Sequence, residues 1–322
     1  MTEPLHSDLN LPGGISVVIP IYNSAASLTA LCAELCPVLA SLGRPHEVIL
    51  VNDGSRDESW KILTACTAAW PNIRGINLMR NFGQHNALLC GIRLARYSTV
   101  VTIDDDLQHP PSEIPALLAK LDEGFDAVYG SPRNLHHGLW RNCASKVTKL
   151  ALQGAMGAAT ARQVSAFRAF RTSIRSAFAA FDGPFPCIDV LLTWGTTRFT
   201  AIEVRHDPRR IGVSNYTFKK LILHTINMTT GFTTVPLQLA SLVGFGCAFF
   251  GLLVLAYVVI RFFMTGSVVP GFPFLASIIA IFSGAQLFAL GIIGEYLARI
   301  HFKTMNRPCY AVSSIIERSD PT

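Results

Sequence analysis

Three consecutive carboxylates, Asp104, Asp105 and Asp106, follow the apolar run from Ser98 to Ile103. Charged residues make up only 15% of the chain, so three acidic side chains after a buried type of strand need a cation or a strong structural reason. If the strand runs through the triplet, Asp104 and Asp106 share one face. With the side-chain oxygen of Gln108, they suit a hard divalent ion that keeps room for phosphate oxygens. The alternative is a solvated acidic turn with an aspartate capping a helix.

The first 133 residues alternate short Val- and Ile-rich runs with helical patterns. Strands are expected at 15–21, 47–51, 73–78, 98–103 and 125–129, and helices at about 25–42, 58–69, 84–95 and 111–123. Such alternation predicts right-handed βαβ units around a mainly parallel sheet. Asn23, Asp53 and Arg80-Asn81 then fall, with the acidic triplet, at the carboxyl ends of strands, where ligands bind in these sheets. This clustering favours a ligand site over a solvated turn.

Two long apolar stretches, Leu237–Phe263 and Phe272–Leu297, lie near the end of the chain, and each can cross about 30 Å of hydrocarbon. Lys and Arg precede the first and follow the second, so the positive-inside rule places both ends in the cytoplasm. The polar N-terminus without a signal-peptide pattern agrees with a cytoplasmic first domain. The segment Tyr216–Thr230 predicts a helix lying on the bilayer, with an ordinary core helix as the alternative. Glycines in the first stretch allow packing against another copy, which leaves a homo-oligomer open.

The charge is unevenly distributed. Residues 1–133 hold nine Lys or Arg and 14 Asp or Glu, whereas residues 134–322 hold 18 and seven. A basic second half beside apolar spans indicates anionic headgroups or phosphate as partners. Nucleic acid is disfavoured because no basic-aromatic or helix-turn-helix pattern is present. The eight cysteines are scattered without CxxC pairs, which fits a reducing compartment and neither a zinc site nor a disulfide framework.

Several segments resemble the membrane-anchored family 2 glycosyltransferases that attach sugars to polyprenyl phosphates. They are Val17–Asn23, Val51–Ser55, Arg80–His85, Asp104–Pro111, Gly212–Tyr216 and Gly294–Ile300, and the likeness covers about residues 15–312. The resemblance implies an α/β, Rossmann-like (GT-A) nucleotide-diphosphosugar domain with interfacial helices and a C-terminal two-helix transmembrane hairpin. The expected divisions are a tail at 1–14, the GT-A domain at 15–212, an interfacial helix at 213–235, the membrane helices at 236–298 and a cytoplasmic tail at 299–322.

Roles follow from the resemblance by position. Pro20, Tyr22 and Asp53 match contacts to the nucleotide base and ribose, and Asp104 lies near the ribose and diphosphate. Asp106 and Gln108 match the pair that binds Mg²⁺ or Mn²⁺. The remaining matches are basic or hydroxyl groups: Arg209 and Ser214 near the donor diphosphate or acceptor phosphate, and, more loosely, Arg133 and Arg141 for the lipid phosphate. Asp104, Asp106 and Arg209 form the expected catalytic group, and His85 and His109 are assigned to helix-start hydrogen bonds or phosphate contacts rather than to base catalysis.

The resemblance implies inverting transfer of a sugar to undecaprenyl phosphate at the bacterial inner membrane. It favours a UDP-sugar as the donor. Such products serve cell-envelope glycan or lipopolysaccharide modification. Two departures from the family pattern stand out: Ser24 replaces the usual Glu, and Arg162–Arg168 lacks the usual Asp-x-Gly run. A processive polysaccharide synthase is a rival, although the Gln-x-x-Arg-Trp motif is missing. An inactive membrane protein that binds sugar nucleotides is the other.

Overall fold

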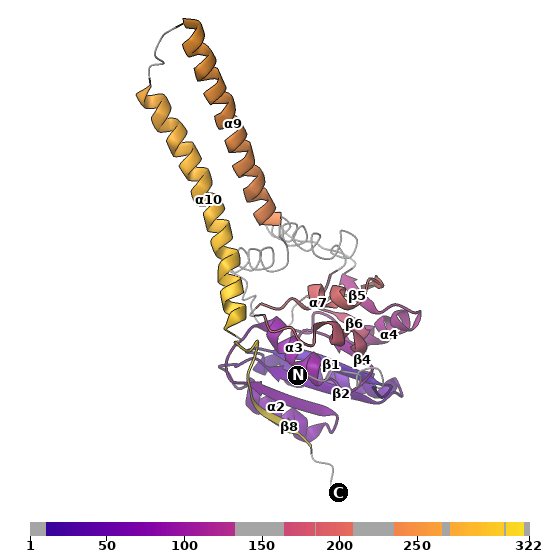
Figure 1. Ribbon diagram of the computed structural model, residues 1–322. Helices are drawn as coiled ribbons and strands as arrows, with labels where there is room; N and C mark the ends of the chain where they lie inside the picture. Colours follow the sequence, from indigo (N-terminus) through magenta and orange to yellow (C-terminus); the bar gives the residue numbers. More distant parts are fainter. Residues whose placement is uncertain are drawn as a thin grey trace.

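The computed structural model describes residues 11–132, 164–183, 185–208, 235–265, 271–305 and 307–318. An eight-stranded sheet in the order β7-β5-β6-β4-β1-β2-β3-β8 lies at the foot of a long helical hairpin (Figure 1). The strands are β1 (Ile15–Ile21), β2 (His46–Asn52), β3 (Ile73–Leu78), β4 (Thr99–Thr102), β5 (Ala127–Pro132), β6 (Arg168–Arg171), β7 (Phe199–Val204) and β8 (Val312–Glu317). The sheet is mixed α/β as the sequence predicts.

Parallel pairing dominates the first part of the chain. Strand β1 pairs in parallel with β2 and β4, β2 pairs in parallel with β3, and β5 pairs in parallel with β7. Strand β6, which the sequence patterns did not predict, is antiparallel to β4 and β5. Every residue of β1 is buried, as expected for a central strand covered on both faces. The carboxyl ends of β1, β2, β3 and β4 therefore meet at one edge, where the polar segments were expected.

Helices cover both faces of the sheet. Because strand side chains alternate, Val17 and Ile19 join one core with α1 (Ala25–Ser41), α2 (Ser59–Ala69) and α4 (Ile114–Asp122). Val18 joins a second core with α3 (Gln84–Leu94) and α7 (Ile188–Gly195). Two short 3₁₀ helices, η2 (Pro111–Glu113) and η3 (Thr172–Phe178), complete the described helices of the sheet domain. The result is a three-layer α/β/α domain.

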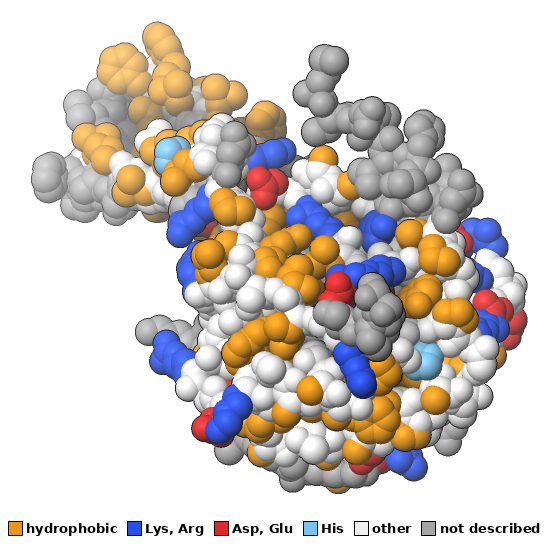
Figure 2. All heavy atoms as spheres, turned by 90° about the horizontal axis from the view of Figure 1, so that it is seen from below, with side chains coloured by type: hydrophobic (Ala, Val, Ile, Leu, Met, Phe, Trp, Pro, Cys, Tyr) orange, Lys and Arg blue, Asp and Glu red, His pale blue; other side chains and the backbone are white. Residues whose placement is uncertain are grey.

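The hairpin consists of α9 (Val235–Thr265) and α10 (Phe272–Thr304). At 1.5 Å per residue, a helix of 31 residues is about 46 Å long, which exceeds the hydrocarbon thickness of a bilayer. Both helices are apolar enough to cross a membrane, and none of the residues in their most apolar windows is buried. In Figure 2 the hairpin, at upper left, carries mostly hydrophobic side chains, whereas the domain surface mixes basic, acidic, apolar and uncharged groups. The expected interfacial helix at 213–235 lies almost wholly outside the described residues.

Much of the segment expected to form a cytoplasmic tail, residues 299–322, belongs to a helix and a strand. Helix α10 continues to Thr304, and β8 then joins the sheet antiparallel to β3. The alternation of β8, with Ile316 half-buried between exposed neighbours, is that of an edge strand with one covered face. The sequence analysis missed it because an isolated six-residue run after a membrane segment gives no sign of its distant partner. The folded domain therefore includes residues from both sides of the hairpin.

Candidate active site

The acidic triplet lies in a turn rather than on a strand. Pairing of β4 ends at Thr102, which is matched with Val18 of β1 and Arg168 of β6. Leu107 then takes a φ of 58°, a left-handed conformation that is uncommon for a leucine. The alternation of a strand therefore does not set the directions of the three carboxylates, and the expectation that two of them share a strand face was wrong. The turn still places all three at the carboxyl edge of the sheet, each of them half-buried.

Two of these carboxylates have neutral partners that fix their position. Gln84 Nε2, at the start of α3, donates a 2.8 Å hydrogen bond to Asp104 Oδ1. Asp106 Oδ1 accepts a 3.1 Å bond from the backbone N–H of Gln108, which closes the turn on itself. Such donors orient the two carboxylates within the turn. Asp104, Asp106 and Gln108 thus lie in one turn at this edge of the sheet, and their roles stay predictions.

Asp105, to which the sequence analysis gave no role, is held by Ser24. The Ser24 hydroxyl donates to Asp105 Oδ2, and the Ser24 backbone N–H donates to Ser59 Oγ over 2.8 Å. Burial raises the pKa of Asp105, and the bond from Ser24 opposes that shift. The departure from the family pattern at position 24 therefore supplies a short hydroxyl that ties the start of α1 to the acidic turn. The sequence shows a small polar residue after β1, but it gives no sign that its partner lies 81 positions away.

Asp53 organises a second loop at the same edge. Its carboxylate is buried and accepts backbone N–H groups from Phe82 at 2.7 Å and Gly83 at 2.8 Å. Burial is the main influence on the Asp53 pKa and raises it, against the lowering effect of these two bonds. Gly54 has a φ of 61°, and a Cβ there would lie 2.4 Å from the carbonyl carbon of Arg80. Asp53 thus shapes the loop between β3 and α3, and its contact with a nucleotide stays a prediction.

Pro20 and Tyr22 lie at the end of β1 beside this loop system. Pro20 is buried and paired with Val51, whereas Tyr22 is 37% exposed. Asn23 turns the chain with a φ of 54° and accepts the backbone N–H of Arg56 at 2.8 Å. An exposed aromatic ring at a strand end suits stacking on a planar base. These placements agree with a nucleotide site at this edge, and the individual contacts stay predictions.

The two histidines differ in their surroundings. His85 Nδ1 accepts the backbone N–H of Ile188 at 3.4 Å, which connects the starts of α3 and α7. His109 is 7% exposed, and its ring packs against Phe167 and His206 with centroids 5.4 and 4.9 Å away. Among the described residues, neither ring nitrogen of His109 has a hydrogen-bond partner, so the expected helix-start bond is not seen. Burial lowers the pKa of His109 to about 4, so the ring is neutral near pH 7.

A buried polar network under the acidic turn escaped the sequence analysis. Arg168 on β6, which is 2% exposed, contacts Asp189 Oδ1 through Nη1 and donates from Nε to Thr102 Oγ1 over 2.9 Å. Tyr129 donates its hydroxyl to the same Asp189 oxygen over 3.2 Å. Burial raises the pKa of Tyr129 well above its ordinary value, so the hydroxyl keeps its proton. One charge in each of two otherwise apolar runs, at Arg168 and Asp189, was the signal for this pair.

The chemistry of the donor set fits a hard divalent cation. Asp106 and Gln108 offer carboxylate and amide oxygens, the ligand types that Mg²⁺ and Mn²⁺ favour. No cluster of three or more His, Cys, Asp or Glu residues suited to a metal occurs in the parts of the chain that the structure describes. The set therefore suits an ion that completes its shell with phosphate oxygens rather than a closed protein site. The other predicted residues, Arg133, Arg141, Arg209 and Ser214, lie outside the described residues.

Comparison with protein families and curated sequences gives consistent matches. The model of "Glycosyl transferase family 2" matches residues 16–172. The chain is 38% identical over 307 residues to undecaprenyl-phosphate 4-deoxy-4-formamido-L-arabinose transferase of Shewanella sediminis, which covers 94% of this chain and 92% of the relative. It is 35% identical to the transferase of the same description from Pectobacterium atrosepticum, with 95% of each chain covered.

Solved structures share the fold of the sheet domain. The crystal structure of glucosyl-3-phosphoglycerate synthase from Mycobacterium tuberculosis, in complex with Mn²⁺, UDP and glucosyl-3-phosphoglycerate, matches with a TM-score of 0.51 and 18% identity. The match covers 68% of this chain and 78% of that chain. A second complex of that enzyme, with Mn²⁺, UDP and phosphoglyceric acid, gives the same TM-score and identity. These likenesses show the GT-A fold.

Proposed function

Because the chain belongs to glycosyltransferase family 2, we propose that it transfers a sugar from a nucleotide-sugar, favoured to be a UDP-sugar, to undecaprenyl phosphate at the cytoplasmic face of the bacterial inner membrane. The observation that carries the proposal is the acidic turn at the carboxyl edge of the parallel strands, with Asp104, Asp106 and Gln108 together. Two exposed apolar helices beside this domain support a lipid-linked acceptor. The descriptions of the relatives name undecaprenyl phosphate, and neighbours of the same fold bind UDP with Mn²⁺.

The donor is expected to bind along this edge of the sheet. Tyr22 would contact the base, the loop held by Asp53 would line the site, and Asp104 would lie near the ribose and diphosphate. Gln84 holds Asp104 in place for this contact. A divalent cation held by Asp106 and Gln108, Mg²⁺ or Mn²⁺, would supply positive charge that offsets the charge developing on the diphosphate leaving group.

The acceptor needs no strong general base. A phosphate monoester has a second pKa near 6, so its oxygen is already anionic at neutral pH. That oxygen forms a bond to the anomeric carbon while the bond from this carbon to the diphosphate oxygen breaks, which inverts the configuration. Arg209 and Ser214, with Arg133 and Arg141, are the proposed contacts to the acceptor phosphate and the donor diphosphate. Guanidinium groups suit phosphate oxygens because they donate two hydrogen bonds in parallel.

The membrane arrangement follows the charges. The basic second half would face anionic headgroups, and α9 and α10 would cross the bilayer with both ends in the cytoplasm. The site would then meet the lipid phosphate at the bilayer surface. The proposed organisation is a GT-A domain of residues 15–212, an interfacial helix of residues 213–235 and two spans within 236–298, with β8 completing the sheet.

A donor panel tests the proposal. The purified full chain is mixed with undecaprenyl phosphate, Mg²⁺ or Mn²⁺, and radiolabelled sugar nucleotides of the UDP and GDP classes. A labelled lipid that carries one sugar, lost on chelation with EDTA, is the expected result. Long polymer would identify a processive synthase instead, and nucleotide binding without any product would identify an inactive binding protein. Either of these two results overturns the proposed activity.

A further inference from the structure

The segment that follows the second membrane helix, Arg307–Glu317, runs back over the domain and is called the strap here. Its first anchor is Cys309, which is 5% exposed and donates its thiol to the carbonyl oxygen of Gly183 over 3.1 Å. Its second anchor is Tyr310, whose ring lies 5.7 Å from the guanidinium carbon of Arg93 on α3. Arg93 in turn donates to the carbonyl oxygen of Ala179 over 3.1 Å. The strap is therefore fixed to the domain within a few residues of the end of α10.

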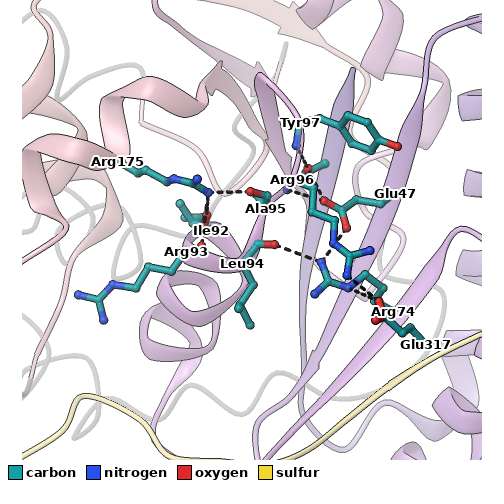
Figure 3. A network of polar contacts seen from close by, with 11 residues as sticks. Glu47, Arg74, Ile92, Arg93, Leu94, Ala95, Arg96, Tyr97, Arg175 and Glu317 are labelled. Atoms are coloured by element: carbon teal, nitrogen blue, oxygen red, sulfur yellow. Dashed lines mark hydrogen bonds and ion pairs between the residues drawn. The ribbon is translucent and has the colours of Figure 1, made fainter. Parts of the chain in front are cut away.

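The far end of the strap is fixed by charge (Figure 3). Glu317 lies 2.8 Å from Arg96 Nη2 and 3.1 Å from Arg74 Nε, the latter without the alignment of a hydrogen bond. Arg74 is buried and also pairs through Nη1 with Glu47 at 2.8 Å. Between these anchors Ile316 lies over Gly75, where a Cβ would come within 2.7 Å of the isoleucine Cγ1. The edge of the sheet at β3 is thus closed by a closely packed strand.

The middle of the strap contacts the start of the loop that leads to the candidate active site. The last pair of the β3–β8 ladder joins Leu78 to Val312, and the backbone N–H of Met79 donates to the carbonyl oxygen of Ala311 over 2.9 Å. Met79 opens the loop whose amides at Phe82 and Gly83 are bound by Asp53. The same loop ends at Gln84, which donates to Asp104. Hydrogen bonds and four residues of chain therefore connect the strap to the acidic turn.

We propose that the strap positions the loop Met79–Gln84 for donor binding, so that a segment reached only after the membrane hairpin completes the nucleotide site. This inference rests on the proposed function for the identity of the donor. Ala311 and Tyr310 act as positioning residues because they touch the loop and α3 rather than the reacting atoms. The competing explanation is that β8 only protects the sheet edge, in which case loosening the strap lowers stability and leaves the loop unchanged.

The first test removes one hydrogen bond. Met79→Pro deletes the N–H that reaches Ala311, while Met79→Ala keeps it and removes a side chain that is 69% exposed. Binding of UDP in the presence of Mn²⁺ is measured by calorimetry on the full chain in detergent. Met79→Pro is expected to weaken UDP binding about five- to tenfold, as for loss of one ordering hydrogen bond, and Met79→Ala about twofold or less. In a Gln84→Ala background the proline effect is expected to shrink below about twofold, because the loop has already lost its tie to Asp104.

The second test needs no ligand. Tyr310→Ala loosens the strap from outside the loop, and Tyr310→Phe keeps the ring over Arg93 as the matched control. In Tyr310→Ala, hydrogen–deuterium exchange of the peptide covering Met79–Gln84 is expected to rise about tenfold, while exchange in α1 stays as in the wild type. In Tyr310→Phe, exchange of the Met79–Gln84 peptide is expected to stay as in the wild type. Unchanged exchange in that loop overturns the inference, as does unchanged UDP affinity in a folded Met79→Pro protein. Absence of UDP binding by the unmodified chain counts against the proposed donor instead, and the exchange experiment still decides the role of the strap.

Discussion

Two groups of carboxylates in this domain are held in opposite ways. Glu47 on β2 and Glu317 on β8 pair with arginines: Arg74 of β3 lies between them and Arg96 beside Glu317. The hydrogen bonds described above for Asp104–Asp106 come from a hydroxyl, a side-chain amide and a backbone N–H, which are all neutral. Pairing with arginine is expected to make Glu47 and Glu317 important for the fold, whereas the hydrogen bonds from neutral donors orient Asp104–Asp106 at the edge of the proposed donor site. We therefore expect substitutions in the first group to lower stability and substitutions in the second group to lower transfer.

The largest expected effect is on activity, in Asp106→Ala. This change removes the carboxylate proposed to hold the cation, and transfer is expected to fall by at least about a thousandfold, within the range seen for loss of one electrostatic contribution to a transition state. Thermal unfolding is expected to stay within about 2 °C of wild type because the carboxylate is half-buried and its bond from the Gln108 N–H lies within its own turn. Rates of lipid labelling and melting curves measure the two quantities. Full activity of Asp106→Ala in the presence of EDTA would refute the metal-assisted mechanism.

The converse effect is expected in Glu47→Ala. Glu47 is 5% exposed and accepts bonds from Ser16 Oγ, Arg74 Nη1 and the backbone N–H of Arg96. Its removal leaves the buried Arg74 charge poorly compensated, which costs about 3 kcal/mol of folding free energy. Chemical denaturation monitored by circular dichroism measures the loss, with Glu47→Gln as the control that retains an acceptor. Unchanged unfolding together with a large loss of UDP affinity would place Glu47 with the carboxylates of the proposed site and contradict its structural role.

Local sequence patterns predicted the parallel half of the fold well. The run from Ile15 to Ile21 is wholly apolar except for Ser16 and Pro20, and it forms β1 over the predicted residues. Strands β6 and β8 were missed for a physical reason. They pair antiparallel with strands far away in sequence, and their partners decide their structure more than their own composition does.

The sequence predicted where on the sheet the candidate site lies, but not its geometry. The clustering of polar segments at strand ends located Asp53, Asp104 and Asp106 correctly, because chain direction in a parallel sheet fixes which ends meet. The turn at Leu107 and the bond between Ser24 and Asp105 depend on where pairing of β4 stops, and no local pattern states this. A burial pattern alone likewise could not reveal that Asp53 binds the backbone of a neighbouring loop.

A smaller effect on stability is expected for His109, a buried side chain that is uncharged near pH 7. Because both ring nitrogens lack partners among the described residues, His109→Phe is expected to raise the unfolding free energy at pH 7 by about 1 kcal/mol. The folded-state pKa of about 4 lies below the ordinary 6.5, so the stability tied to the neutral ring is fully present above pH 6.5. This contribution to the unfolding free energy is lost as the pH falls from 6.5 towards 4. The unfolding free energy of His109→Phe should not show this decrease. Denaturation at several pH values without divalent ions measures it, and an unchanged pH profile would contradict a buried neutral ring.

The smallest effect is expected where a carboxylate and an arginine meet in solvent. Arg44 Nη2 lies 3.0 Å from Asp122 Oδ2, with side chains 52% and 41% exposed, so water competes with the pair and holding it costs side-chain entropy. Arg44→Ala is expected to change the unfolding free energy by less than about 0.5 kcal/mol and to leave transfer unaffected. The melting temperature and the rate of lipid labelling check both statements. A loss as large as that of Glu47→Ala would mean that pairing with arginine, rather than burial of the pair, is what makes a carboxylate of this domain structural.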